Sequence, residues 1–249
     1  MSIRNEVTQM KETAPLLASS KEEIRNEALR RIIETLKSRK EEIFEANRKD
    51  REAARRDHIA PAVMKRLLFD EEKLESLVSG LEQLIRLPDP VGHITLAREL
   101  DTHLKLYRVT CPIGVIGIIF EARPDALVQI SALCIKSANC AILKGGKETK
   151  ETNRILFSLI HEAAVSAGLP EKAWLQAEQH SEIDELLQCD GLVDLLIPRG
   201  SNEFVRYIMD HTKIPVMGHA EGICHIYADK ACDKKKAIPI IIDAKTQYP

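Results

Sequence analysis

Residues 112–148 read PIGVIGIIFEARPDALVQISALCIKSANCAILKGGKE, and the architecture of the chain follows from them. They hold two unbroken apolar runs, Val115–Phe120 and Cys140–Lys144, with a helical pattern at 124–138 between them. Apolar runs without alternation predict strands covered on both faces, and a helix between two such strands predicts parallel pairing. Similar units follow toward the C-terminus. We therefore expect an α/β fold with a doubly wound parallel sheet from about residue 112 onward.

Three parts are expected along the chain. Residues 1–98 carry apolar side chains at helical spacing, and Ser20 with Glu23 predicts a capping box at the start of one helix. Mixed alternation over Asp101–Thr110 predicts one or two extended strands with a turn near Asp101-Thr102, and 113–249 is the α/β part. The further predicted strands are Ala173–Gln176, Leu192–Ile197, Ile214–Met217 and Ile223–Tyr227, and the further predicted helices are 149–167, 181–188 and 201–211.

Composition excludes several classes of function. The 249 residues carry a net charge of −2 and only 4% aromatic residues, which argues against nucleic acid as a partner. No apolar run approaches the roughly 20 residues that span a bilayer, so no membrane partner is expected. The six cysteines show no disulfide framework or zinc spacing, which favours a reducing compartment and predicts no metal site.

Ligands of such sheets bind beyond the carboxyl ends of the strands, so the turns after the predicted strands form the candidate site. Lys144-Gly145-Gly146-Lys147-Glu148 lets a ligand approach the backbone closely and offers both cations and a carboxylate. Arg199-Gly200-Ser201 joins a strand to a helix whose first amides suit a phosphate. Each turn also fits an ordinary βα connection with surface charges.

A third turn, Glu121-Ala122-Arg123-Pro124, places an arginine at the start of a helix, where anions are favoured. The alternative is that Arg123 pairs with Glu121 or Asp125 on the surface. His219 lies near the end of another predicted strand, but its spacing to neighbouring residues does not match a metal site.

Five segments together resemble the gamma-glutamyl phosphate reductase family, a branch of the aldehyde dehydrogenase superfamily. The resemblance runs over nearly the whole chain and implies an aldehyde-dehydrogenase-like cofactor domain with N-terminal helices and a protruding hairpin. The segments are Cys111–Val115, Phe120–Pro124, Leu143–Glu148, Pro198–Asn202 and Pro215–Cys224.

The resemblance implies NADPH-dependent reduction of L-glutamyl 5-phosphate to L-glutamate 5-semialdehyde, a step of proline biosynthesis in the cytoplasm. It implies that Lys144 and Glu148 hold the adenosine ribose, with Lys144 or Lys147 toward a 2′-phosphate. Ala122 stands where ordinary aldehyde dehydrogenases carry an oxyanion asparagine. The expected cofactor-binding set is Lys144, Gly145, Gly146, Lys147, Glu148, Arg199, Gly200 and Ser201, and the candidates on the nicotinamide or substrate side are Glu121, Ala122, Arg123 and His219.

The resemblance also implies what lies outside the sequence. The family's nucleophilic cysteine is expected shortly after Pro249, so we expect this chain to contain no catalytic residue and no catalytic domain, and to be inactive as given. The segment 99–112 matches the superfamily's oligomerisation hairpin, so a homo-oligomer is expected. The alternatives are a non-catalytic nucleotide-binding or assembly module and, without the resemblance, another α/β enzyme acting on a phosphate ligand.

Overall fold

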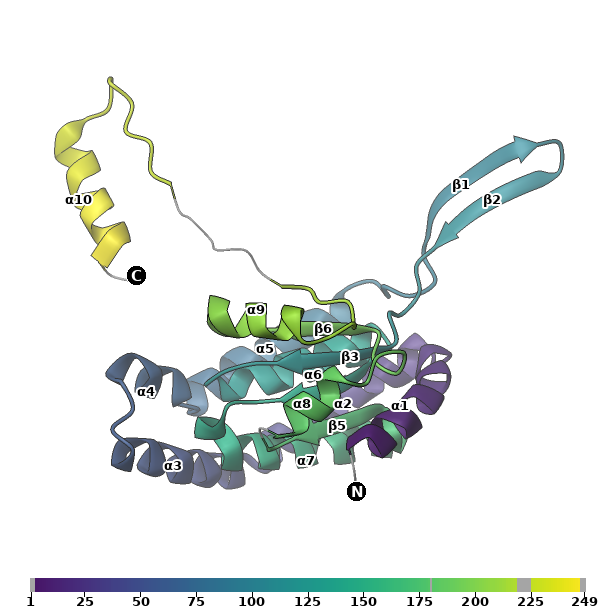
Figure 1. The fold of residues 1–249 in the computed structure, drawn as a ribbon, viewed down its shortest axis with the longest axis horizontal. Helices are drawn as coiled ribbons and strands as arrows, with labels where there is room; N and C mark the ends of the chain where they lie inside the picture. Colours follow the sequence, from purple (N-terminus) through teal and green to yellow (C-terminus); the bar gives the residue numbers. More distant parts are fainter. Residues whose placement is uncertain (1–2, 180, 219–224, 247–249) are drawn as a thin grey trace. The chain divides into compact units, whose positions relative to one another are not determined.

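A computed structural model describes residues 3–179, 181–218 and 225–246 (Figure 1). The chain divides into two units, Met1–His219 and Ala220–Pro249, and each is described by itself. All of the candidate site residues except His219 lie in the described part of the first unit. His219 lies outside the described residues.

The first unit begins with helices, as the spacing of apolar residues predicts. The capping box at Ser20 is wrong, because the Ser20 hydroxyl donates to the carbonyl of Leu17 at 2.6 Å and closes the preceding helix instead. The next helix starts after Lys21 without a side-chain cap. The helices are α1 (Ile3–Ala18), α2 (Glu22–Ser38), α3 (Lys40–Arg56), α4 (Pro61–Leu67) and α5 (Glu71–Arg86).

A four-stranded parallel sheet follows, in the order β5-β4-β3-β6, and confirms the predicted α/β class. Every residue of β3 and β4 is buried, as their unbroken apolar sequences predict. The elements are β3 (Val115–Ile119), α6 (Pro124–Lys136), β4 (Cys140–Lys144), η1 (Lys147–Thr149), α7 (Lys150–Ser166), η2 (Glu171–Ala173), β5 (Trp174–Ala177), α8 (Ser181–Leu187), β6 (Leu195–Pro198) and α9 (Asn202–Asp210).

Three predicted strands differ from the structure. The strand predicted at Leu192–Ile197 starts only at Leu195. Ile214–Met217 contributes one isolated bridge, between Val216 and Leu196, and no longer strand. The strand at Ile223–Tyr227 is wrong for 225–227, which have no regular structure, and its first two residues lie outside the described part. In the second unit the structure describes α10 (Lys234–Thr246), which the sequence analysis did not predict.

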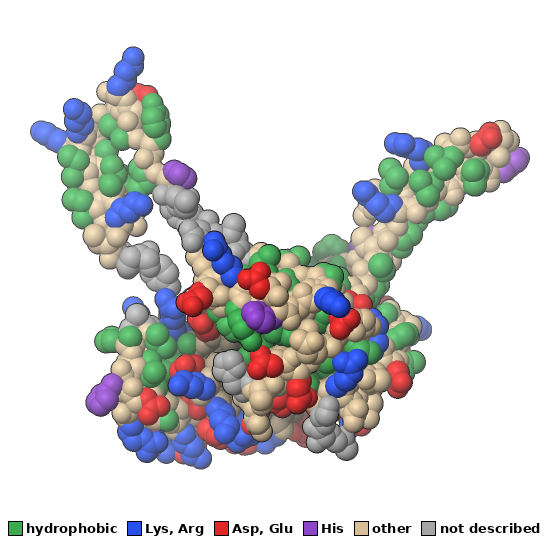
Figure 2. Space-filling view, in the orientation of Figure 1, with side chains coloured by type: hydrophobic (Ala, Val, Ile, Leu, Met, Phe, Trp, Pro, Cys, Tyr) green, Lys and Arg blue, Asp and Glu red, His purple; other side chains and the backbone are tan. Residues whose placement is uncertain are grey.

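The predicted hairpin consists of β1 (Ile94–Asp101) and β2 (Leu104–Val109), so it starts five residues before the expected 99–112. Its turn falls at Thr102 and His103, as expected. Nearly all of its residues are exposed on both faces, and Figure 2 shows hydrophobic side chains along it. The exposed apolar residues are Ile94, Leu100, Leu104, Leu106, Tyr107 and Val109.

Two buried cations join the N-terminal helices to the sheet domain. Arg25 on α2 is 2% exposed, and it donates to Asp89 at 2.7 Å and 3.1 Å and to the carbonyl of Lys136 at 2.6 Å. The ammonium of Lys136 in turn donates to Glu22 at 2.9 Å and to Asn26 at 3.0 Å. Buried charges are tolerated only when they are paired and hydrogen-bonded, so this network fixes α2 against α6.

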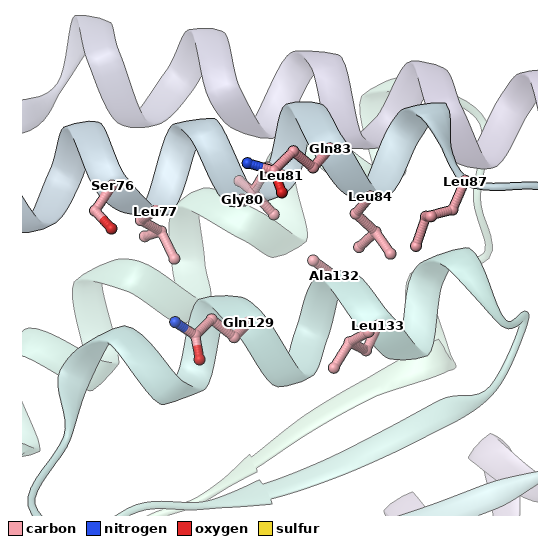
Figure 3. Close-up of a pocket in the computed structure, with 10 residues that line it drawn as sticks. All are labelled: Ser76, Leu77, Gly80, Leu81, Gln83, Leu84, Leu87, Gln129, Ala132 and Leu133. Atoms are coloured by element: carbon pink, nitrogen blue, oxygen red, sulfur yellow. The ribbon is translucent and has the colours of Figure 1, made fainter.

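An apolar groove of about 340 Å³ lies between α5 and α6 (Figure 3). Gly80 widens it, because a Cβ at this position would meet no atom within 4 Å. Leu84 and Ala132 face each other across the groove, and Leu133 on its rim is exposed.

Within the described residues, no helix is both long and apolar enough to cross a bilayer.

Candidate functional site

The three predicted turns come together at one edge of the sheet. The strand register pairs Ile119 with Lys144 on one side and with Pro198 on the other, so β3, β4 and β6 end level. Two backbone hydrogen bonds extend this pairing into the turns: Phe120 N donates to Lys144 O at 2.9 Å, and Arg199 N donates to Ile119 O at 2.7 Å. The turns after these strands are therefore neighbours.

Close packing of the turns explains two of their glycines. A Cβ on Gly146 would lie 3.2 Å from the backbone nitrogen of Ala122. A Cβ on Gly200 would lie 2.9 Å from Oε1 of Glu121. The turns after β4 and β6 thus lean on the turn after β3 from either side, and larger residues would push the three apart.

Lys144 is the last residue of β4, one of the two inner strands of the sheet. The residue is 8% exposed, and its ammonium donates to the carbonyl of Gly145 at 2.8 Å, its one hydrogen-bond acceptor among the described residues. Burial lowers the pKa of Lys144, while the negative charges of Glu182, Glu148 and Glu178 act in the opposite direction. A buried ammonium with donors to spare is suited to bind an anion.

Ser201 opens α9 at the same edge. Its side chain accepts a hydrogen bond from Phe204 N at 3.2 Å, so it is the helix N-cap that the sequence predicts. Lys147, on the turn after β4, and Arg199, on the turn after β6, are both exposed. The positive end of a helix dipole and two solvent-accessible cations therefore join Lys144 at this edge.

Arg123 is the N-cap residue of α6 and is exposed. The alternative of a surface ion pair is not what the structure has: among the described residues Arg123 has no carboxylate within ion-pairing distance, and Asp125 lies 3.8 Å from Lys73. Glu121 is exposed and Ala122 is buried. Arg123 is thus available at the edge near the Gly146 turn.

Asp50 is a residue that the sequence analysis missed. It lies on α3, is 5% exposed, and accepts hydrogen bonds from Glu151 N at 3.0 Å, Thr152 N at 2.8 Å and the Thr152 hydroxyl at 2.6 Å. It therefore caps α7, whose own N-cap residue, Thr149, makes no side-chain cap. The amides at the start of α7 are occupied, so this helix end is closed to a ligand.

A charged cluster at the ends of β4 and β5 was also missed. The carboxylate of Glu178, the residue after β5, binds the guanidinium of Arg154 through two contacts of 2.9 Å and 2.7 Å. Glu182 accepts from the backbone nitrogen of Glu178 at 2.7 Å. The strand-end rule, applied to the predicted strand 173–176, would have drawn attention to Glu178.

The described cysteines are poor nucleophiles where they are buried. Burial raises the pKa of Cys134 and of Cys140 to about 12, so both are thiols at neutral pH. Burial also raises the pKa of Cys189. In the part of the chain that the structure describes, no three His, Cys, Asp or Glu side chains are grouped so as to hold a metal ion.

Known proteins resemble this chain both in sequence and in structure. A gamma-glutamyl phosphate reductase of Ruminiclostridium cellulolyticum is 53% identical over 233 residues, which are 93% of this chain and 54% of that protein. The crystal structure of a gamma-glutamyl phosphate reductase from Thermotoga maritima matches with a TM-score of 0.90 and 33% identity, over 98% of this chain and 59% of that one. No model of a protein family matches the chain.

A more distant structure shares the fold. An acetylating aldehyde dehydrogenase from Geobacillus thermoglucosidasius matches with a TM-score of 0.66 and 15% identity, over 98% of this chain and 51% of that one. The chain therefore shares its fold with that aldehyde dehydrogenase. By sequence, the chain is a homologue of the gamma-glutamyl phosphate reductases, which confirms the resemblance noted in the sequence. The chain spans about half the length of the curated relatives it matches.

Proposed function

We propose that the converging turns after β3, β4 and β6 bind NADPH. The observation that carries this proposal is the Lys144 ammonium, buried at a strand end beside two glycines, with a single protein acceptor among the described residues. A phosphate or ribose oxygen supplies the acceptors that this cation lacks. Gly146 and Gly200 let the three turns pack closely enough for their polar groups to meet at one ligand.

The remaining residues fit a dinucleotide. Ser201 and the first turn of α9 are suited to the diphosphate, since a helix N-terminus favours anions. The Glu148 carboxylate accepts from ribose hydroxyls, and Lys147 with Arg199 adds positive charge at the edge. NADPH supplies a hydride when bound. The turn with Glu121, Ala122 and Arg123 then lies toward the nicotinamide and the substrate, and we propose the same for His219.

The reaction that we propose is NADPH-dependent reduction of L-glutamyl 5-phosphate to L-glutamate 5-semialdehyde, in the cytoplasm and as part of proline biosynthesis. The names of the relatives and their identity to this chain support it. In this proposal residues 113–249 bind the coenzyme and residues 1–98 support them. The buried thiols of Cys134 and Cys140, protonated at neutral pH, are poor nucleophiles.

Titration of the purified chain with NADPH tests the coenzyme proposal. Lys144→Met is expected to weaken binding by about 10- to 100-fold, because a charge-assisted hydrogen bond is worth about 1.5–3 kcal/mol. Lys172→Met is the matched control, since Lys172 is exposed on η2 at the opposite end of β5. Equal affinities of the wild type and Lys144→Met would contradict the proposal, and so would an equal loss in the control.

We further propose that the hairpin mediates a homo-oligomer. Its apolar side chains are exposed on both faces. Apolar residues exposed in this way along an isolated strand pair are typical of a surface that contacts another chain. Light scattering after gel filtration is expected to give a multiple of the monomer mass, and Leu104→Glu with Leu106→Glu is expected to give the monomer. A wild-type chain of monomer mass at micromolar concentration would refute the oligomer.

A further inference from the structure

The end of β5 lies next to the end of β4. The register pairs Lys144 with Ala177, so Glu178 leaves the sheet beside Gly145 at the edge of the proposed coenzyme site. Neighbouring strands are about 4.8 Å apart. A group on the turn after β5 is therefore close enough to act on a ligand bound at Lys144.

The carboxylate of Glu178 is held in place rather than free to move. Arg154 on α7 grips both of its oxygens, Nε to Oε1 at 2.9 Å and Nη2 to Oε2 at 2.7 Å. Glu182 fixes the backbone of the same turn by accepting from the nitrogens of Glu178 and Gln179, at 2.7 Å and 2.5 Å. A bidentate pair of this kind keeps one orientation.

Glu178 lies within the electrostatic reach of several cations. Arg154 lowers its pKa most, through the hydrogen bonds, and the charges of Lys150 and Lys144 lower it further. In the same way the charges of Glu182, Glu148 and Glu178 act on Lys144. Arg154 and Glu178 therefore belong to the same set of charges as the proposed ribose-binding lysine.

NADPH and NADH differ only at the adenosine ribose, where NADPH carries a 2′-phosphate and NADH carries a 2′-hydroxyl. A carboxylate accepts a hydrogen bond from a hydroxyl but repels a phosphate, whereas a guanidinium binds phosphate in a bidentate manner. Arg154 therefore favours NADPH, and Glu178 favours NADH. Because the two side chains are paired, each reduces the effect of the other on coenzyme preference.

We propose that the Arg154–Glu178 ion pair determines how strongly this chain prefers NADPH over NADH. The inference rests on the proposed coenzyme site. Glu178 holds Arg154 at the edge of the proposed site, and its negative charge reduces the preference for the 2′-phosphate. Arg154 neutralises the charge of Glu178, so the phosphate can approach.

Dissociation constants of NADPH and NADH, measured by calorimetric titration for two variants, test the proposal. Glu178→Gln is expected to increase the preference for NADPH about three- to tenfold, the effect of one unit charge several ångströms away in a largely aqueous site. Arg154→Gln is expected to decrease it by a similar factor. Lys40→Gln and Glu71→Gln are the controls, since this exposed pair has similar contacts of 2.9 Å and 2.8 Å.

The opposite signs separate specificity from structure. Either variant breaks the same ion pair, so a purely structural role would move both coenzyme affinities in the same direction and leave their ratio unchanged. That outcome would overturn the inference and leave the coenzyme site standing. A wild-type chain that binds neither dinucleotide would overturn both.

Discussion

Arg25→Met is expected to lower the free energy of unfolding by about 3–5 kcal/mol, the cost of breaking a buried ion pair from one side. Arg25 is 2% exposed, and its guanidinium holds Asp89 and the Lys136 carbonyl at the junction of α2 with α6. Methionine fills similar volume but leaves these acceptors without their donor. Urea denaturation followed by circular dichroism measures the loss.

Arg48→Met provides the comparison for Arg25. Arg48 also has two carboxylate partners, Glu45 and Glu52, but all three side chains are exposed on α3. Surface ion pairs contribute little because water and salt screen them. The midpoint of denaturation is expected to stay unchanged in this variant. If the two substitutions had equal effects, burial of the Arg25 network would not be what stabilises the junction.

Asp50→Ala is expected to cost about 3 kcal/mol of stability. The variant leaves the amides of Glu151 and Thr152 without an acceptor, and hydrogen bonds to a charged group are worth about 1.5–3 kcal/mol each. The start of α7 would loosen, and with it the preceding turn from Gly145 to Glu148. Thermal unfolding measures the first effect, and NADPH titration measures the second.

Asp50→Asn separates the charge from the hydrogen bonds, since the amide keeps one acceptor oxygen. Burial raises the pKa of Asp50 above its ordinary value, so the folded chain takes up this proton before the unfolded chain does as the pH falls. The stability of the wild type relative to Asp50→Asn is therefore expected to increase toward acid pH. A relative stability that decreases toward acid pH would contradict the burial of this carboxylate.

The central strands were predictable because a strand that is buried on both faces has apolar residues along nearly its whole length. Val115–Ile119 and Cys140–Lys144 are unbroken apolar runs, and both are entirely buried. The runs near the end of the first unit were ambiguous for the opposite reason. Pro215, Val216 and Met217 resemble a strand in composition, but only Val216 bridges to the sheet. A short apolar run at the border of a sheet does not reveal whether a partner strand lies beside it.

Residues whose partners are distant in sequence could not be predicted. Asp50 caps a helix that starts about a hundred positions later, and in the sequence it is one more charge on a highly charged helix. The capping box at Ser20 failed for a related reason, because a closer acceptor, the Leu17 carbonyl, competes for the hydroxyl. The convergence of the turns that carry Lys144 and Ser201 was predictable, because neighbouring strands of a parallel sheet end at the same edge whatever the distant partners are.

The strand order has a consequence for the way the chain folds. β3 pairs with β4, and β4 with β5, each through a single helical crossover, whereas β6 must return to β3 across some eighty residues. Joining segments that far apart costs loop-closure entropy before any contact compensates for it, so we expect β6 to dock last. Arg199 and Ser201 arrive with that strand. The proposed coenzyme site is therefore incomplete in a folding chain until this slowest closure is finished.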